Sequence, residues 1–164
     1  MWDEYLKILK CYPKLYEDLN CGCQEEEIQR VENIVGLRFP EELRSVYLKN
    51  DGQKGNTDGI FKAISGYDKY SRPRFLPIAS VATAWRDLCN DENLDIFEKT
   101  YIPFAIDNEN KMDDVYCINV ESGDIYLLWV LIDDPFHPAE WQTNKLLRAT
   151  SLKEFLLNQI NLYG

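Results

Sequence analysis

Hydrophobic residues recur with a helical period in the first half of the chain, and this pattern predicts three amphipathic helices. Pro13 interrupts the first pattern, Gly36 is suited to ending the second helix, and Pro40 to opening the third. Residues 50–59 contain three glycines and predict an irregular loop. In chain order, the apolar positions of the three helices are Trp2, Tyr5, Leu6 and Leu9; Ile28, Val31, Ile34 and Val35; and Leu43, Val46 and Tyr47.

Alternating or continuous apolar segments, which are typical of strands, dominate the second half. The pattern at 101–106 places Ile102, Phe104 and Ile106 on one face. Apolar residues on both faces of 125–132 indicate a central strand that is covered on each side. Residues 67–77 predict a loop that leads to a sheet edge. Strands are therefore expected at residues 60–64, 101–106, 116–120 and 125–132.

Two further helices are predicted around these strands. Ser80 is suited to capping the first of them, and Ser151 with Glu154 forms the S-x-x-E of a capping box before the second. The elements together predict an α+β fold in one domain, residues 1–164. In this fold, N-terminal helices precede a central, mostly antiparallel sheet, and a C-terminal helix packs on it.

The charge of the chain is unevenly distributed. Of 164 residues, 28 are acidic and 18 basic, so the formal net charge is −10. Residues 87–140 contain 14 of the acidic residues and only Lys99 and Lys111 as bases, so this segment carries −12. Nucleic acids and anionic membranes are recognised through Lys and Arg, so we expect direct binding to neither. The charge instead favours a basic partner.

The first residues predict no export. Residues 1–4 include two acids where a signal peptide would be basic, and the apolar run 126–132 is far shorter than the ~20 residues of a membrane helix. We therefore expect a cytoplasmic protein with reduced thiols. Cys21 and Cys23 lack the C-x-x-C spacing and a second pair of ligands, which favours ordinary thiols in a turn over a metal site.

The common catalytic motifs are missing. There is no dinucleotide-binding, P-loop or nucleophile-elbow motif, and the single histidine, His137, excludes sites that need two. A calcium loop starting at Asp91 fails because Ile96 stands where glycine is required. Pairing of Cys89 or Cys117 with His137 stays open as a nucleophilic dyad. Hydrolysis by paired carboxylates also stays open, and the candidates are Asp107, Glu109, Asp113, Asp114, Asp133 and Asp134.

Several segments together resemble the SUKH superfamily, also called the Smi/Knr-type domain. The most specific one is Gly36-Leu37-Arg38-Phe39-Pro40-Glu41-Glu42-Leu43, which follows the Glu25–Ile28 and Val31-Glu32 segments and precedes Asn50-Asp51-Gly52. Phe75–Ile78, Ile102–Ala105, Ser122–Ile125 and Ala149–Leu156 continue the resemblance in order. The chain departs from the pattern at Phe39, at Cys23 and in the split Asn-Gly of residues 50–52.

This resemblance implies a non-enzymatic α+β domain that binds proteins, without cofactor or metal. Bacterial members are typically immunity proteins of polymorphic toxin systems, which neutralise a cognate toxin in the cytoplasm. The leading hypothesis is therefore an immunity protein that blocks a toxin domain, such as a basic nuclease. A scaffold or regulatory module without a toxin is the alternative.

Residues for partner binding are expected in the acidic loops between the strands. Trp141 lies in a polar stretch, where an exposed aromatic side chain can anchor a partner or, when buried, pin a loop onto the sheet. No residue is predicted to be catalytic. The predicted contact residues are Asp107, Glu109, Asp113, Asp114, Asp133, Asp134, Glu140 and Trp141.

Overall fold

Helices begin and end the chain, and most strands lie in its second half. The computed structural model describes residues 1–64, 70–91, 94–108, 112–131 and 142–164. Its helices are α1 (Trp2–Leu9), α2 (Pro13–Glu17), α3 (Glu25–Val35), α4 (Glu41–Lys49), α5 (Ile78–Asn90) and α6 (Leu152–Tyr163). Its strands are β1 (Ala63–Ile64), β2 (Tyr70–Ser71), β3 (Arg74–Phe75), β4 (Tyr101–Asp107), β5 (Met112–Asn119), β6 (Ile125–Leu131) and β7 (Gln142–Ala149).

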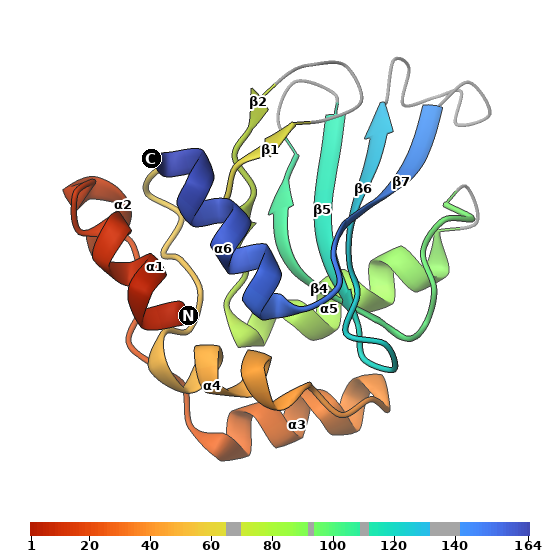
Figure 1. The fold of residues 1–164 in the computed structure, drawn as a ribbon. Helices are drawn as coiled ribbons and strands as arrows, with labels where there is room; N and C mark the ends of the chain where they lie inside the picture. The colour runs from red at the N-terminus through yellow and green to blue at the C-terminus, as the bar shows by residue number, and fades with distance from the viewer. Residues whose placement is uncertain (65–69, 92–93, 109–111, 132–141) are drawn as a thin grey trace.

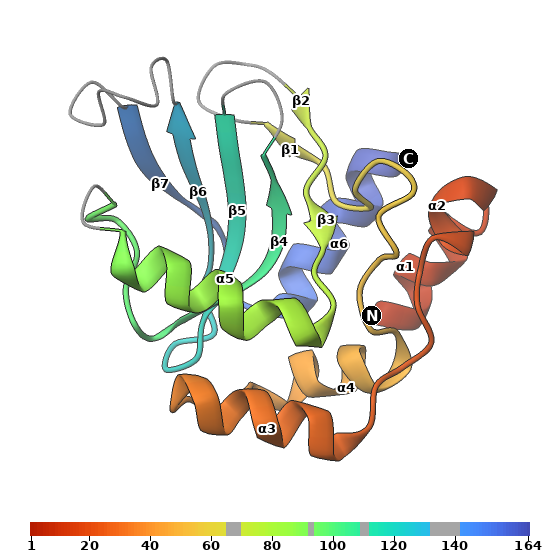
Figure 2. The ribbon, with the colours of Figure 1, turned by 180° about the vertical axis from the view of Figure 1, so that it is seen from behind.

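An antiparallel sheet in the order β3-β4-β5-β6-β7 forms the middle layer (Figure 1). Helix α6 crosses one face of the sheet, and Figure 2 shows α5 across the other face. Helix α1 packs beside α6, and α3 packs beside α5. Strands β1 and β2 form a separate two-stranded ribbon. The α+β class expected from the sequence is confirmed, including the C-terminal helix on the sheet.

Two hydrophobic clusters fill the space on the two sides of the sheet. The larger cluster contains Tyr116 of β5 and Phe155 of α6, whose ring centroids lie 4.8 Å apart. The smaller cluster contains Val115 and Cys117, packed near Leu88 of α5. Successive residues of a strand point to opposite faces, so β5 supplies both clusters in alternation. This alternation decides the placement of the acidic residues at the beginning of β5.

The turn Asn50-Asp51-Gly52 joins α4 to distant parts of the chain. The Trp2 indole N–H donates a hydrogen bond to Asn50 Oδ1 at 3.0 Å. Gly52 has φ +67°, and a Cβ atom there would lie 2.3 Å from the Pro77 backbone nitrogen. Only glycine combines that backbone conformation with so close an approach. The Asn50-Asp51-Gly52 segment, which is one of those that carry the family resemblance, therefore has a structural role.

Helix α5 begins earlier than the sequence pattern predicted. Its first residue is Ile78, preceded by Pro77, and Ser80 makes no capping hydrogen bond to this helix. The Asp51 carboxylate accepts a hydrogen bond from the Ile78 N–H at 2.6 Å. The expectation of a Ser80 cap is wrong because the capping group comes from a turn 27 residues away along the chain.

Most predicted helix boundaries are confirmed. Gly36 ends α3 in the left-handed conformation with φ +71°, and α4 starts directly after Pro40. The Ser151 hydroxyl accepts a hydrogen bond from the Glu154 N–H at 3.1 Å at the start of α6. Each of these signals is local, since the residue acts on its own helix end.

Strand predictions were less accurate. Residue Ile106 packs in the smaller cluster, on the face opposite Ile102 and Phe104, because the pairing of β4 with β5 shifts between Pro103 and Ala105. The short strand expected at 60–64 is limited to β1. Helix α2 and strand β7 are not predicted by the sequence pattern, and neither are β2 and β3, which lie within the loop expected at 67–77. The partly solvated β7 has an exposed Leu147. Within the described chain, every helix is too short or too polar to span a bilayer.

Candidate functional site

Strands β5, β6 and β7 begin or end side by side at one end of the sheet. The predicted contact residues lie near these strand ends in the sequence. The Cα atoms of Met112, Leu131 and Gln142 are neighbours in register across β5, β6 and β7. Three of the predicted contact residues, Asp107, Asp113 and Asp114, are described and belong to the same end of β4 and β5. The other five lie outside the described residues: Glu109, Asp133, Asp134, Glu140 and Trp141.

Asp113 and Asp114 are adjacent in β5 but lie on opposite sides of the sheet. Asp113 lines a groove beside α5 together with Val115. Asp114 shares a face of β5 with Tyr116, which packs against Phe155 of α6. Adjacent strand residues point to opposite faces, so these two carboxylates cannot act on one substrate as a catalytic pair.

Asp114 is buried almost completely, with 1% of its surface exposed. Its Oδ1 accepts no hydrogen bond of normal geometry within the described chain. Burial raises the pKa of this carboxyl group, and the negative charges of Asp107 and Asp113 raise it further, whereas Ser71 and Arg148 lower it. Its burial makes Asp114 a structural group of the sheet rather than an exposed contact, which the sequence alone could not reveal.

Asp107 ends β4 opposite Asp114 in the register. Its Oδ2 accepts a hydrogen bond from the Arg72 backbone N–H at 2.8 Å, which joins the edge of the sheet to the segment after β2. The Asp107 charge also raises the pKa of Asp113 and of Asp114. It therefore adds negative potential on both sides of the sheet.

A groove of about 420 Å³ lies between α5 and strands β4 and β5, and we call it the α5 groove. Asp113 and Asp87 are its two charged residues. Burial raises the pKa of Asp113, and the charges of Asp107 and Asp91 raise it further. The groove is lined by Leu76, Ala79, Ser80, Thr83, Ala84, Asp87, Leu88, Ile106, Asn108, Asp113 and Val115.

The sequence contains one signal for this groove. Ala79, Thr83 and Asp87 are spaced four residues apart, so they lie on one face of α5. Small side chains along a helix keep it from filling the space against a neighbouring sheet, and the stripe ends at a carboxylate. The sequence does not reveal that this face of α5 and Asp113 line the same groove, because their proximity depends on how α5 packs on the sheet.

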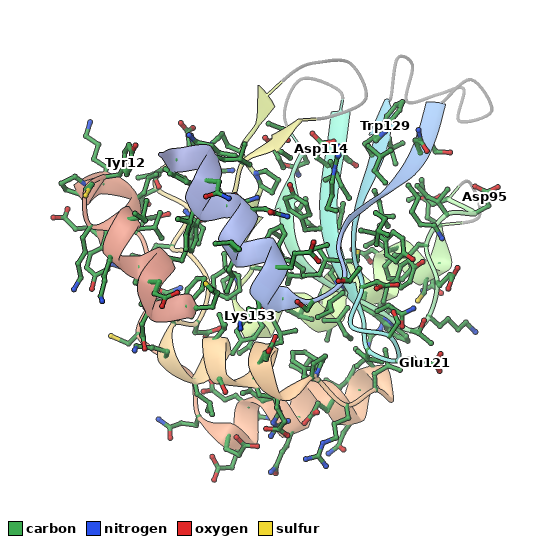
Figure 3. The ribbon with its side chains drawn as sticks, viewed as in Figure 1. Tyr12, Asp95, Asp114, Glu121, Trp129 and Lys153 are labelled. Carbon is green, nitrogen blue, oxygen red and sulfur yellow. The ribbon has the colours of Figure 1, made fainter. Side chains whose placement is uncertain are left out.

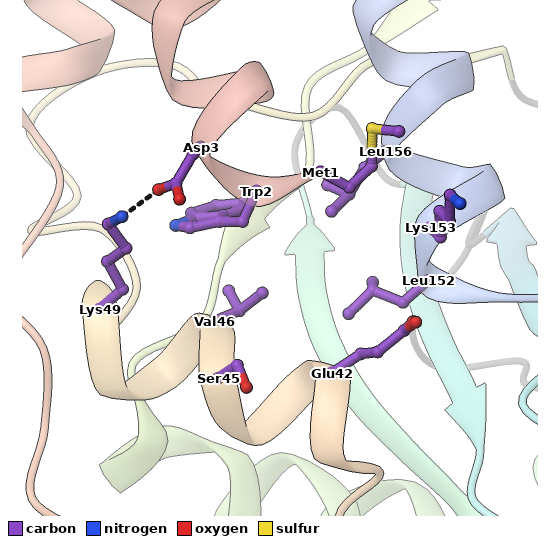
Figure 4. A pocket seen from close by; sticks show the side chains of 10 residues that line it. All are labelled: Met1, Trp2, Asp3, Glu42, Ser45, Val46, Lys49, Leu152, Lys153 and Leu156. Atoms are coloured by element: carbon purple, nitrogen blue, oxygen red, sulfur yellow. Dashed lines mark hydrogen bonds and ion pairs between the residues drawn. The ribbon is translucent and has the colours of Figure 1, made fainter.

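A second hollow of almost the same size, about 410 Å³, lies where α1, α4 and α6 meet, and we call it the α4 pocket. Figure 4 shows Asp3 and Lys49 paired at one side, with Glu42 and Lys153 at the other. The two acidic and two basic side chains of this pocket balance one another. Its other lining residues are Met1, Trp2, Ser45, Val46, Leu152 and Leu156.

A third hollow, of about 750 Å³, lies beside α2 and the loop before β1. Its charged lining residues are Lys14, Arg72 and Asp58, so its net charge is positive. Of these three hollows, only the α5 groove has the negative charge that the composition suggested for a binding site.

The acidic residues of the second half that the structure describes do not form one surface. Figure 3 shows Asp114 toward one end of the sheet, Glu121 in the β5–β6 turn at the opposite end, and Asp95 to one side beyond α5. Connections between antiparallel strands alternate between the two ends of a sheet, so acids that are close in sequence are separated in space. The described acidic residues of the second half therefore lie at both ends of the sheet.

The described residues contain no arrangement of side chains that suits metal binding or a reactive thiol. There, His, Cys, Asp and Glu side chains form no group of three or more that could hold a metal ion. All five cysteines are free thiols. Cys117 is completely buried, and burial raises its pKa well above the ordinary value, which disfavours it as a nucleophile. His137, its proposed partner in a dyad, lies outside the described residues.

The described elements define the class of this protein as an α+β domain with a five-stranded antiparallel sheet and an acidic groove on one face. The model of the SMI1/KNR4 family (SUKH-1) matches residues 22–158. The chain therefore belongs to this family, as the resemblance of the sequence indicated. A search among curated proteins gave no match.

Proposed function

We propose that this protein is a cytoplasmic immunity protein, which binds a cognate toxin domain and neutralises it without catalysing a reaction. Membership of the SUKH-1 family supports the proposal, and so does the acidic composition. The observation that carries it is the set of carboxylates at one end of β4 and β5, where Asp113 lines a groove whose charged residues are all acidic, unlike those of the α4 pocket.

The proposed mechanism is steric and electrostatic blocking. Nucleases and other phosphate-binding enzymes have basic sites, because they must hold phosphate groups. A carboxylate-rich edge competes for such a site and accelerates encounter through long-range attraction. Asp113 and Asp114 lie on opposite faces, which further disfavours the alternative of a hydrolase that uses this pair.

The test uses the toxin domain encoded beside the gene of this protein. The intact chain should bind it in a 1:1 complex and stop its activity in proportion to the amount added. Association should slow by about tenfold or more between 50 and 500 mM NaCl, because steering by exposed charge is screened by salt.

Other outcomes would contradict the proposal. Inhibition by substoichiometric amounts would indicate turnover and hence an enzyme. Absence of binding to this domain would favour the scaffold alternative, in which the same fold serves partners other than a toxin. An association rate that does not change with salt would remove the electrostatic part of the mechanism while leaving the steric part.

A further inference from the structure

The α5 groove is lined by side chains of different chemistry. Its large apolar residues are Leu88, Ile106 and Val115. Its charged residues are Asp87 and Asp113. The small side chains of α5 keep this space of about 420 Å³ open. A ligand that fits must therefore combine an apolar body with a positive end.

The carboxylates of the groove have no cation beside them in the described chain. The ion pairs there involve other residues, and neither Asp87 nor Asp113 accepts a hydrogen bond from a described residue. The charges that act on Asp113 are those of Asp107 and Asp91, and both are negative. A half-buried carboxylate in such surroundings is destabilised, and a cation supplied from outside relieves it.

Among protein side chains, arginine matches this combination most closely. Its methylene groups can cover apolar surface while the head group stays at a polar rim. Its guanidinium group is weakly hydrated and has five N–H donors, which suit two carboxylates better than the compact ammonium group of lysine does.

We infer that the α5 groove receives an arginine side chain of a partner protein. The arginine methylenes cover Ile106 and Val115, and the guanidinium group lies between Asp87 and Asp113. This inference deepens the proposed function and rests on it for the partner, since a basic toxin domain would supply the arginine. The groove itself is tested without the toxin.

The experiment is an NMR titration of the full chain, labelled with ¹⁵N, with N-acetyl-arginine amide. Saturable shifts are expected for the backbone amides of Thr83, Ala84, Asp87 and Asp113. N-acetyl-citrulline amide, which has nearly the same shape but no charge, should bind about tenfold more weakly, because it lacks the charge-assisted hydrogen bonds.

Two matched variants locate the site. Asp113→Asn should weaken arginine amide binding about tenfold, because it removes one charged acceptor with little change in shape. Glu42→Gln removes one negative charge from the α4 pocket and should leave the affinity unchanged within about twofold. The spectrum of each variant also shows whether its fold is intact.

Three results would overturn the inference: equal shifts with citrulline amide, equal weakening by both variants, or shifts concentrated around the α4 pocket. The outcome is independent of the toxin experiment. Specific arginine binding without toxin binding would contradict the proposed function alone. Toxin binding without specific arginine binding would contradict the inference alone.

Discussion

The α5 groove and the α4 pocket are nearly equal in volume, about 420 and 410 Å³, but differ in the charges around them. The α4 pocket has two acids and two bases, and one pair, Asp3 and Lys49, is already joined. The α5 groove has two acids and no base among its lining residues. The size of a hollow therefore says little about its role. A charge without a counter-charge beside apolar surface is more informative about the role of a hollow. Such a charge destabilises the folded protein until a partner supplies the opposite charge.

Neutralising one acid in each hollow tests the comparison most strongly. In the complex with the toxin domain, Asp113→Asn should raise the dissociation constant about 30-fold, as removal of a charged central contact costs about 2 kcal/mol. Glu42→Gln should change it by less than about twofold, since a distant exposed charge contributes only steering. Isothermal titration calorimetry measures both constants. Equal losses would mean that overall charge, rather than the groove, governs binding.

Filling each hollow should produce the next largest effect. Ala84→Leu adds a side chain to the α5 groove and should weaken toxin binding about tenfold by excluding the arginine. Ser45→Leu is its counterpart in the α4 pocket and should weaken binding less than about twofold. Surface plasmon resonance measures both affinities, and circular dichroism checks that each variant stays folded. Tight binding by Ala84→Leu would place the contact outside the groove.

The wall of the α5 groove depends on the turn after α4. Asp51→Ala removes the acceptor for the Ile78 N–H and should lower the free energy of unfolding by about 1–2 kcal/mol. Hydrogen exchange should accelerate about tenfold at the start of α5, with a smaller change in α4. Asp51→Asn keeps an acceptor oxygen and is the control. If α4 lost protection as strongly as α5, the turn would support both hollows equally.

The smallest expected effect is on the pH dependence of stability. Burial, Asp107 and Asp91 raise the folded-state pKa of Asp113 above its unfolded value of about 3.9. Between these two values the folded state binds more protons, so the Asp113 contribution to the free energy of unfolding falls as pH rises. Asp113→Asn removes this destabilising contribution and should be more stable at pH 7, by less than about 1 kcal/mol.

Urea unfolding of both proteins at pH 3 and at pH 7 measures that difference. The gain of Asp113→Asn should disappear at pH 3, where the carboxyl group is protonated in the folded and unfolded chain alike. Glu42→Gln should stay within about 0.5 kcal/mol of wild type at pH 7. A stability loss in Asp113→Asn at pH 7 would show that the carboxylate has a stabilising cation after all.

Elements whose signals are local can be predicted from the sequence. Gly36, Pro40 and the Ser151 cap act on their own helix ends, and their effects were predictable. The order of helices and strands determined the α+β class in the same way. These predictions succeed because helix periodicity and capping depend on residues a few positions apart.

The direction in which the predicted site residues face depends on how the sheet and helices pack. The alternation of β5 placed Asp113 in the α5 groove and buried Asp114 on the other side of the sheet. The register shift in β4 moved Ile106 to the smaller cluster, and antiparallel connections separated Glu121 from Asp114. The net charge of a segment does not depend on the direction in which its side chains point. A binding site depends on which face each carboxylate occupies and on what packs beside it, and both are properties of the packed sheet and helices.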